Sequence, residues 1–313
     1  MSEKIDKKIS VVIPCYNEES NLPELYTRVT EVLASLAVQY EIIFTDNKST
    51  DTTRKLLRDL AERDKHVKVL FFARNFGNSQ YGYSAGSAYA TGDVVIWMEA
   101  DLQDPPEVIR EFIKKWQEGF QIVYGVRSQT EGSFFSQLLR HAFYKVFKKL
   151  SYLDIPVDAG DFSLLDRKVI DIFNTMPERS RLVRGMRAWI GFQCAGVAYK
   201  RKKRAGGMTS NPNFIKNLWW AKKLIFSFSE TPLTFITNIT LWLVIMIPFF
   251  IIFMVLLVYI EIISWIMAFA FIVIMVILTL QTIALSFLGE SMNIMFEEVK
   301  QRPLYVIEEK INF

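Results

Sequence analysis

The sequence predicts an α/β fold, in which a mostly parallel sheet is flanked by helices, followed by a hairpin of two membrane-spanning helices. Two observations predict it. Residues 9–124 alternate between short apolar runs, which are typical of strands, and longer amphipathic runs, which are typical of helices. Two long stretches without any charge then follow residue 238. A chain of 313 residues is long enough for both parts.

The elements of the α/β part follow in a regular order. Apolar runs predict strands at residues 9–13, 41–45, 67–72, 93–98 and 121–124, and helical patterns fill the gaps at residues 21–37, 52–63, 79–90 and 106–118. Asp51 is a candidate N-cap of the second helix, and Pro106 suits a first helical turn. Because each helix can act as the crossover between two parallel strands, the alternation favours a parallel sheet.

The uncharged stretches are residues 239–260 and 262–288. Each is longer than the roughly 20 apolar residues that a membrane-spanning helix needs. Lysine and arginine are absent from residues 224–299 but frequent on both sides. Because cations mark cytosolic flanks, we expect a two-span protein of the plasma (inner) membrane with the α/β domain and both termini in the cytosol.

Two further segments, residues 134–150 and 214–228, are predicted as amphipathic helices. Each has apolar residues at helical spacing and cations between them. Such a helix either faces a protein core or lies in the headgroup layer of a bilayer, and the second segment directly precedes a predicted span, which favours the membrane surface. The predicted organisation is therefore an α/β domain (1–210), a juxtamembrane amphipathic helix (211–230), the spans (231–290) and a cytosolic tail (291–313).

Composition excludes several classes of protein. The formal net charge of +4 is too small to indicate a nucleic-acid-binding protein. Two cysteines cannot build a disulfide framework, and two isolated histidines argue against a histidine-based metal site. A Gly-x-Gly-x-x-Gly sequence, which a dinucleotide-binding enzyme would carry, is absent after the first strand.

Polar residues are concentrated where the predicted strands end, at residues 14–19, 46–51 and 99–104. In open α/β sheets, ligands bind beyond the carboxyl ends of the strands. Glu99 and Asp101 flank a single residue, and either Gln103 or Asp104 can supply a third oxygen. Three oxygen donors suit Mg²⁺ or Mn²⁺ shared with substrate phosphates, whereas an isolated pair of this kind is also typical of solvated loop charges.

Several short motifs along the chain are characteristic when taken together. They are Val11-Val12-Ile13-Pro14-Cys15-Tyr16-Asn17-Glu18-Glu19, Arg74-Asn75-Phe76-Gly77, Ala90-Thr91-Gly92-Asp93, Ala100-Asp101-Leu102-Gln103-Asp104-Pro105-Pro106, Gly160-Asp161-Phe162, Met176-Pro177-Glu178-Arg179 and Phe287-Leu288-Gly289-Glu290 with Arg302-Pro303-Leu304-Tyr305. Together they resemble family-2 glycosyltransferases of the GT-A (Rossmann-like) fold, in the polyprenyl-phosphate branch that includes bactoprenol glucosyl transferases and dolichol-phosphate mannose synthases. The resemblance covers nearly the whole chain.

The resemblance implies a role for each matching position. It assigns nucleotide-sugar binding to Pro14, Tyr16, Glu18, Asp46 and Asp101; the metal and diphosphate site to Glu99, Asp101 and Gln103; the acceptor phosphate to Arg127 and Arg140; and the catalytic carboxylate to Asp101 together with Asp158 or Asp161. A further basic cluster, at Arg179, Arg181, Arg184 and Arg187, is interpreted either as a solvated or headgroup-facing surface or as a diphosphate contact.

The implied function is an inverting hexosyltransferase that moves a sugar, glucose from UDP-glucose as the best guess, to undecaprenyl (polyprenyl) phosphate for cell-envelope glycan or lipopolysaccharide modification. Its partners would be the nucleotide-diphosphate sugar, the polyprenyl phosphate and the lipid bilayer, with Mg²⁺ or Mn²⁺ as cofactor and no nucleic acid. Assembly into a homo-oligomer and the identities of the sugar and the base are left open.

The chain departs from the family pattern at four places. Asn78 stands where a basic residue usually follows Asn-Phe-Gly, and Gly206-Gly207-Met208-Thr209-Ser210 differs from the usual Gly-x-Ser-Lys. The other two departures lie at the predicted donor site. Glu99-Ala100-Asp101 replaces the usual Asp-x-Asp, and Asp46-Asn47-Lys48-Ser49 replaces Asp-Asp-Gly-Ser. These changes keep open an alternative, a catalytically weakened relative that binds nucleotide sugar or lipid without turnover. A polysaccharide synthase is disfavoured, because it would need more spans and a Gln-x-x-Arg-Trp motif.

Overall fold

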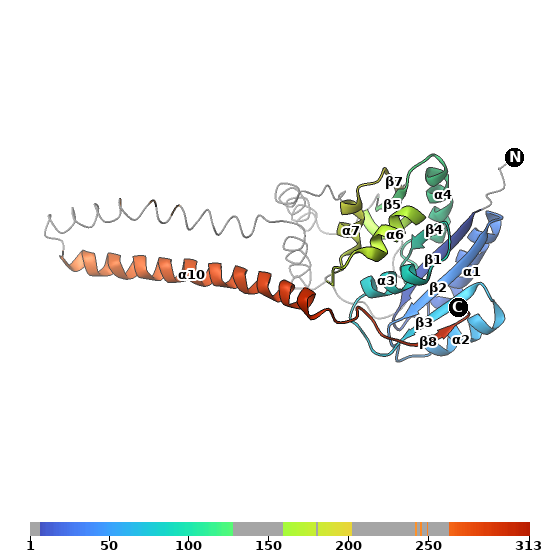
Figure 1. Cartoon of the computed structure of the whole chain (residues 1–313), viewed down its shortest axis with the longest axis horizontal. Coiled ribbons are helices and arrows are strands. Elements are labelled where there is room, and N and C mark those ends of the chain that lie inside the picture. Colours follow the sequence, from blue (N-terminus) through green and yellow to red (C-terminus); the bar gives the residue numbers. More distant parts are fainter. Residues whose placement is uncertain are drawn as a thin grey trace. The chain divides into compact units, whose positions relative to one another are not determined.

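The computed structural model of the chain describes residues 7–127, 159–179, 181–201, 242, 245, 249 and 263–313. Two compact units divide the chain. One comprises residues 1–145, 153–213 and 302–313, and the other comprises residues 146–152 and 214–301. The first unit therefore contains the α/β elements together with the C-terminal end of the chain (Figure 1).

The described elements follow one another as β1 (Lys8–Cys15), α1 (Leu22–Ser35), β2 (Gln39–Asp46), α2 (Thr53–Arg63), β3 (Val67–Phe72), α3 (Ser79–Tyr89), β4 (Val94–Trp97), the 3₁₀ turn η1 (Pro106–Val108), α4 (Ile109–Gln117), β5 (Ile122–Arg127), β6 (Ala159–Asp166), α6 (Arg167–Thr175), α7 (Val183–Ile190), β7 (Cys194–Tyr199), α10 (Ile263–Lys300) and β8 (Ile307–Ile311). Every strand and helix predicted between residues 9 and 124 is present, with its ends moved by at most a few residues. The N-cap of α2 is Thr52 and not the predicted Asp51, which lies one residue earlier and whose Oδ1 accepts from the Thr53 amide at 3.0 Å.

The strands form one sheet in the order β7-β5-β6-β4-β1-β2-β3-β8. β1 pairs in parallel with both β2 and β4, β2 with β3, and β5 with β7. Among the described strands, β6 and β8 run against their neighbours. The predicted sheet flanked by helices is confirmed, and β1 to β4 pair in parallel as expected. The sheet as a whole is mixed, because the antiparallel strands β6 and β8 were missed.

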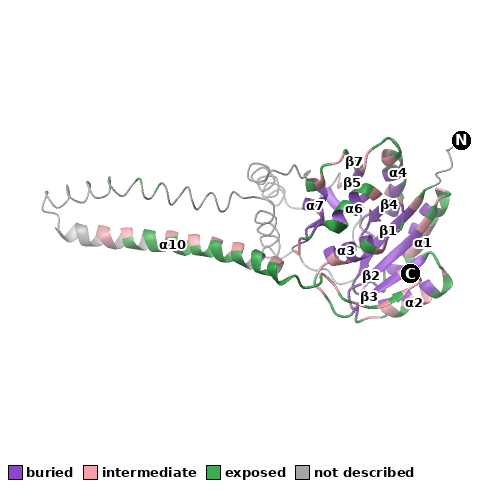
Figure 2. Cartoon of the chain, viewed as in Figure 1, coloured by how far each residue is buried: buried purple, intermediate pink, exposed green. Residues whose placement is uncertain are grey.

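Helices cover both faces of the sheet. The hydrophobic core on one face joins β1 through Ile9, Val11 and Ile13 to residues of α1, α2 and α4. On the other face α3 and α6 pack on the central strands, with Trp97 between rings of α3 and α6. The buried residues accordingly gather along the sheet (Figure 2). At Gly86 of α3 an added Cβ would lie 2.2 Å from Val12 Cγ1. Only glycine at this position therefore lets α3 lie so close to β1.

Part of the predicted membrane-anchoring region belongs to the described residues. In the part of the chain that the structure describes, no helix is long and apolar enough to cross a membrane. Residues 263–288 of the second predicted span belong to α10. The first predicted span, apart from residues 242, 245 and 249, and both predicted amphipathic helices, 134–150 and 214–228, lie outside the described residues.

Glu41 is a buried carboxylate at the amino-terminal edge of the sheet, away from the predicted site. Its oxygens lie 2.9 Å from the ammonium groups of both Lys8 and Lys68, and they accept from Ser10 Oγ at 2.6 Å and the Thr91 amide at 2.7 Å. Burial alone would raise the pKa of Glu41, but these hydrogen bonds outweigh it and lower the pKa to about 2. The network therefore ties β1, β2, β3 and the turn before β4 together.

Replacing Glu41 with glutamine is expected to lower the free energy of unfolding by about 2–3 kcal/mol, because two partly buried lysines lose their counter-charge. Since the folded-state pKa lies below the ordinary value, the contribution is present above pH 4.5 and is lost as the pH falls through about 2. Thermal unfolding at neutral and acidic pH measures it. Glu24→Gln is the control, because the Glu24 carboxylate is 58% exposed in its pair with Arg28. Equal stability losses in the two variants would contradict this role.

Candidate active site

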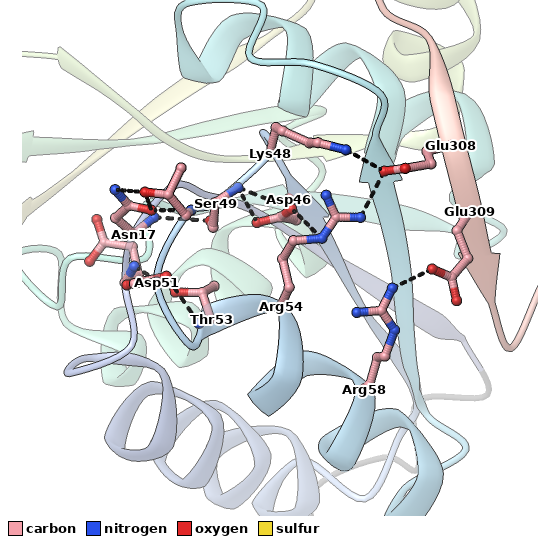
Figure 3. A network of polar contacts seen from close by, with 12 residues as sticks. Asn17, Asp46, Lys48, Ser49, Asp51, Thr53, Arg54, Arg58, Glu308 and Glu309 are labelled. Carbon is pink, nitrogen blue, oxygen red and sulfur yellow. Dashed lines mark hydrogen bonds and ion pairs between the residues drawn. The ribbon is translucent and has the colours of Figure 1, made fainter.

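The loops after β1 and β2 are joined into one structure at the carboxyl edge of the sheet. Cys15 and Asp46 are register partners, so the two loops start side by side. Asn17 adopts a positive φ of 54°, and its amide donates to Ser49 Oγ at 3.0 Å. The Asn17 side chain in turn accepts from the Thr50 amide at 2.8 Å (Figure 3). The structure thus brings together the loops that carry the predicted nucleotide-binding residues.

Those predicted residues differ in exposure. Asp46 is fully buried, Glu18 is nearly so and Tyr16 is 45% exposed. Glu18 accepts from Asn21 Nδ2 at 2.6 Å, and its amide donates to Thr53 Oγ1 at 2.9 Å. Pro14 is the residue before the Cys15–Asp46 pair. The predicted nucleotide-binding residues therefore include one exposed ring, that of Tyr16, and two buried carboxylates, those of Glu18 and Asp46.

The Asp46 carboxylate contacts its own loop and α2. Both of its oxygens accept from the Ser49 amide, at 3.2 and 3.3 Å, and Arg54 Nε lies 3.7 Å from Oδ2. Burial raises the pKa of Asp46, and the contacts with Ser49 and Arg54 only partly oppose this. A hydrogen-bond donor on a ligand would favour the ionised form further.

A second group of carboxylates follows β4. Glu99 is partly buried, and Asp101 Oδ1 accepts from the Gln103 amide at 3.1 Å across Leu102, which has a positive φ of 58°. Burial, followed by repulsion from Asp161 and Asp101, raises the pKa of Glu99 to about 8. Glu99 is thus repelled by one carboxylate of its own loop, which follows β4, and by one at the start of β6.

This donor set fits a divalent cation. Carboxylates that repel one another are stabilised by a cation, and Mg²⁺ takes one or two of them together with phosphate oxygens and water. No group of three or more His, Cys, Asp or Glu side chains within the described ranges is arranged to hold a metal by itself. Glu99 and Asp101 supply the one or two carboxylates that Mg²⁺ commonly takes. Gln103, predicted as the third ligand, contacts Asp101 through its backbone amide.

Asp161, at the start of β6, is the centre of an ion-pair cluster. Arg184 Nε donates to Oδ1 at 2.6 Å, and Gln80 Nε2 donates to Oδ2 at 3.3 Å. Gln80 also accepts from the Val183 amide at 2.8 Å, which ties α3 to the start of α7. Burial opposes ionisation, but Arg184, assisted by Arg187 and Arg127, lowers the pKa of Asp161. Asp161 is therefore an ionised, paired carboxylate at neutral pH.

Arginines surround this carboxylate. Arg187 is 4% exposed, its Nη1 donates to the Gly160 carbonyl at 3.3 Å, and its guanidinium lies over the Tyr124 ring. Burial lowers the pKa of Arg187 to about 10, so it stays charged at neutral pH. Arg127 ends β5, and its guanidinium lies beside Gly160. The cluster thus provides positive charge next to the acidic group.

The outcome for the other predicted residues is mixed. Arg140 and Asp158 lie outside the described residues. The interpretation of the arginine cluster as a solvated surface is wrong for Arg187 and for Arg181, which is 6% exposed and donates to the Phe173 and Met176 carbonyls. Both are buried because backbone carbonyls and neighbouring rings replace water around the guanidinium.

Sequence reasoning missed Gln80 and the importance of Asn47. Gln80 follows the Arg74–Gly77 motif and the helix cap Asn78, but only the fold brings it to Asp161. Asn47, which replaces a family aspartate, accepts from the Phe76 amide at 2.8 Å and donates to Asn75 at 3.1 Å. The substituted residue therefore fixes the loop after β3.

Comparison with known proteins gives consistent results. The profile of "Glycosyl transferase family 2" matches residues 10–173. The chain is 38% identical to an uncharacterized glycosyltransferase of Synechocystis sp., covering 96% of this chain and 95% of that protein. It is 37% identical to the bactoprenol glucosyl transferase of Shigella phage SfV, covering 75% and 76%. The solved mannosyl-3-phosphoglycerate synthase of Rubrobacter xylanophilus, 15% identical, shares the fold with a TM-score of 0.51 over 70% of this chain and 72% of that one. The chain therefore belongs to glycosyl transferase family 2 and has its GT-A fold.

Proposed function

We propose that the protein transfers a hexose, glucose in the first instance, from a nucleotide-diphosphate sugar such as UDP-glucose to undecaprenyl phosphate, with inversion at the anomeric carbon. The observation that carries this proposal is the 37% identity with a bactoprenol glucosyl transferase over 238 residues. The acidic and arginine groups at one edge of the sheet support it, because a diphosphate donor and a phosphate acceptor both need such partners.

The donor would occupy the joined loops after β1 and β2. Pro14, Tyr16, Glu18 and Asp46 would hold the base and the ribose, with the exposed Tyr16 ring available for stacking. Glu99, Asp101 and Gln103 would hold Mg²⁺ or Mn²⁺ at the diphosphate. When bound, the cation would supply positive charge to the departing nucleoside diphosphate.

The acceptor provides its own nucleophile. The second pKa of a phosphate monoester is about 6, so at pH 7 it is mostly a dianion. One of its oxygens would bond to the anomeric carbon while the bond from that carbon to the diphosphate oxygen breaks, and the bonding electrons leave with the diphosphate. Arg127, with Arg140, would hold the acceptor phosphate. Because the acceptor has no proton to lose, the ionised Asp161 serves to orient Arg184 rather than to remove a proton.

The proposed site requires a membrane, because the acceptor carries a long lipid. We propose that residues 239–260 and 262–288 span the plasma (inner) membrane, with the segments 134–150 and 214–228 at its cytosolic surface. The absence of cations from residues 224–299 and their abundance on both sides support this orientation.

Nucleotide-sugar turnover distinguishes this enzyme from a binding protein, the alternative suggested by Glu99, Asn47 and Lys48. Membranes containing the protein are incubated with a panel of radiolabelled nucleotide sugars, with and without undecaprenyl phosphate. We expect one sugar to enter the lipid fraction only when the acceptor is present. Binding of a nucleotide sugar without such transfer would favour the weakened relative.

A further inference from the structure

The C-terminal strand β8 closes the sheet next to the candidate nucleotide loop. It pairs antiparallel with β3, and the Asn312 side chain donates to the Ala61 and Val67 carbonyls at 2.7 and 2.8 Å. Tyr305, just before the strand, stacks on Phe72 with ring centroids 5.5 Å apart. Since α10 ends at Lys300, β8 brings the end of the chain back to the α/β unit.

Glu308 of β8 links this strand to the loop that carries Asp46. Its carboxylate lies 2.9 Å from Lys48 Nζ and 2.8 Å from Arg54 Nη2, while Arg54 Nε lies 3.7 Å from Asp46 Oδ2 (Figure 3). Hydrogen bonds from Arg54 and Lys48 lower the pKa of Glu308 to about 2, so it is ionised at neutral pH. One chain of charges therefore runs from the tail to a fully buried carboxylate of the candidate donor site.

Lys48 has an unusual backbone conformation in this loop. Its φ is +62°, a left-handed conformation that residues with a Cβ disfavour. The family pattern has glycine at this position, which adopts the conformation without strain. In this chain the loop carries a strained lysine whose ammonium group is held by Glu308. The ion pair thus joins the loop between Asp46 and Ser49 to β8.

We propose that Glu308 is a positioning residue for the nucleotide: through Lys48 and Arg54 it fixes the Asp46–Ser49 loop, so that β8 is part of the donor site. The inference rests on the proposed function in that this loop receives a nucleoside diphosphate. It predicts that the end of the chain sets donor affinity, although Glu308 does not itself touch the reacting atoms.

Glu309 offers a matched control on the same strand. Its carboxylate pairs with Arg58 at 2.5 Å, one helical turn beyond Arg54, and both arginines lie over the Phe71 ring. The side chains of Glu308 and Glu309 are similarly exposed, at 44% and 41%. If both glutamates only held β8 in place, their substitution would affect nucleotide affinity equally. If Glu308 positions the nucleotide, only its substitution should weaken binding.

The test compares nucleoside-diphosphate binding by the full-length wild type, Glu308→Gln, Glu308→Asp and Glu309→Gln. Calorimetry with UDP, GDP, TDP and CDP first identifies the best ligand of the wild type. Glu308→Gln is expected to weaken its binding about three- to fivefold, as loss of a partly exposed ion-pair network allows, and to raise the donor KM with little change in kcat or acceptor KM. Glu308→Asp keeps the charge and should recover part of the affinity, and Glu309→Gln should bind as the wild type does.

Unchanged affinity in Glu308→Gln, or equal weakening in Glu309→Gln, would overturn the inference alone. Wild-type protein that binds none of the four diphosphates would overturn the proposed donor site and the inference with it. Because binding is measured without acceptor, failure of transfer to undecaprenyl phosphate would contradict the proposed function while leaving the test of Glu308 intact.

Discussion

Asp101→Asn is expected to lower the kcat of sugar transfer by at least about 100-fold, because it removes a charge from the group that would hold the cation at the diphosphate. The fold should survive, since asparagine keeps the size of the side chain and its oxygen can still accept from the Gln103 amide. Initial rates of transfer at saturating donor, acceptor and Mg²⁺ measure the effect.

Two controls separate charge from geometry in this prediction. Glu99→Asp restores the usual family acid, keeps the charge and should retain activity. Chelator should abolish transfer by the wild type, and added Mg²⁺ or Mn²⁺ should restore it. Normal turnover of Asp101→Asn, or full wild-type activity in chelator, would contradict the cation assignment and leave the arginines to stabilise the leaving group alone.

Arg184→Met is expected to lower the free energy of unfolding by about 2 kcal/mol, because it leaves the Asp161 carboxylate, which also repels Glu99, buried without its main counter-charge. The value allows for the partial exposure of Arg184, which is 33%, against 12% for Asp161. The pKa of Asp161 should rise, since Arg184 is the main group that lowers it. Thermal unfolding at neutral pH measures the loss of stability.

The double variant Asp161→Asn/Arg184→Met tests the reason for this loss. It removes both charges, so it should be more stable than Arg184→Met alone. Arg110→Met is the control for the loss of an arginine as such, and its free energy of unfolding should change little. Arg110 is an exposed residue of α4 that donates to Ser35. A double variant no more stable than Arg184→Met would show that lost packing, rather than the unpaired carboxylate, is responsible.

The elements that the sequence predicted are those whose apolar pattern is continuous. β1 and β3 are buried along most of their length, so their hydrophobic runs identify them. β8 reads Ile-Glu-Glu-Lys-Ile, a short and charged edge strand that resembles any polar tail. It becomes a strand only because β3 offers an unpaired edge, which no local pattern can indicate.

The candidate site shows the same division. Glu99, Asp101 and Asp46 were identified because they follow strands, and strand ends meet at one edge. The pairing of Asp161 with Arg184 and the link from Glu308 to Lys48 depend on residues 23 and 260 positions apart. Long-range contacts of this kind follow from the packed fold, so they could not be predicted from spacing.

The most direct test of the proposed function is the structure of the lipid product. Purified protein is incubated with UDP-glucose, undecaprenyl phosphate and Mg²⁺, and the lipid fraction is analysed by mass spectrometry and NMR. The account predicts undecaprenyl phosphate carrying one glucose in a phosphodiester linkage, with the anomeric configuration inverted relative to the donor. A glucosyl lipid with retained configuration, or free glucose as the only product, would contradict it.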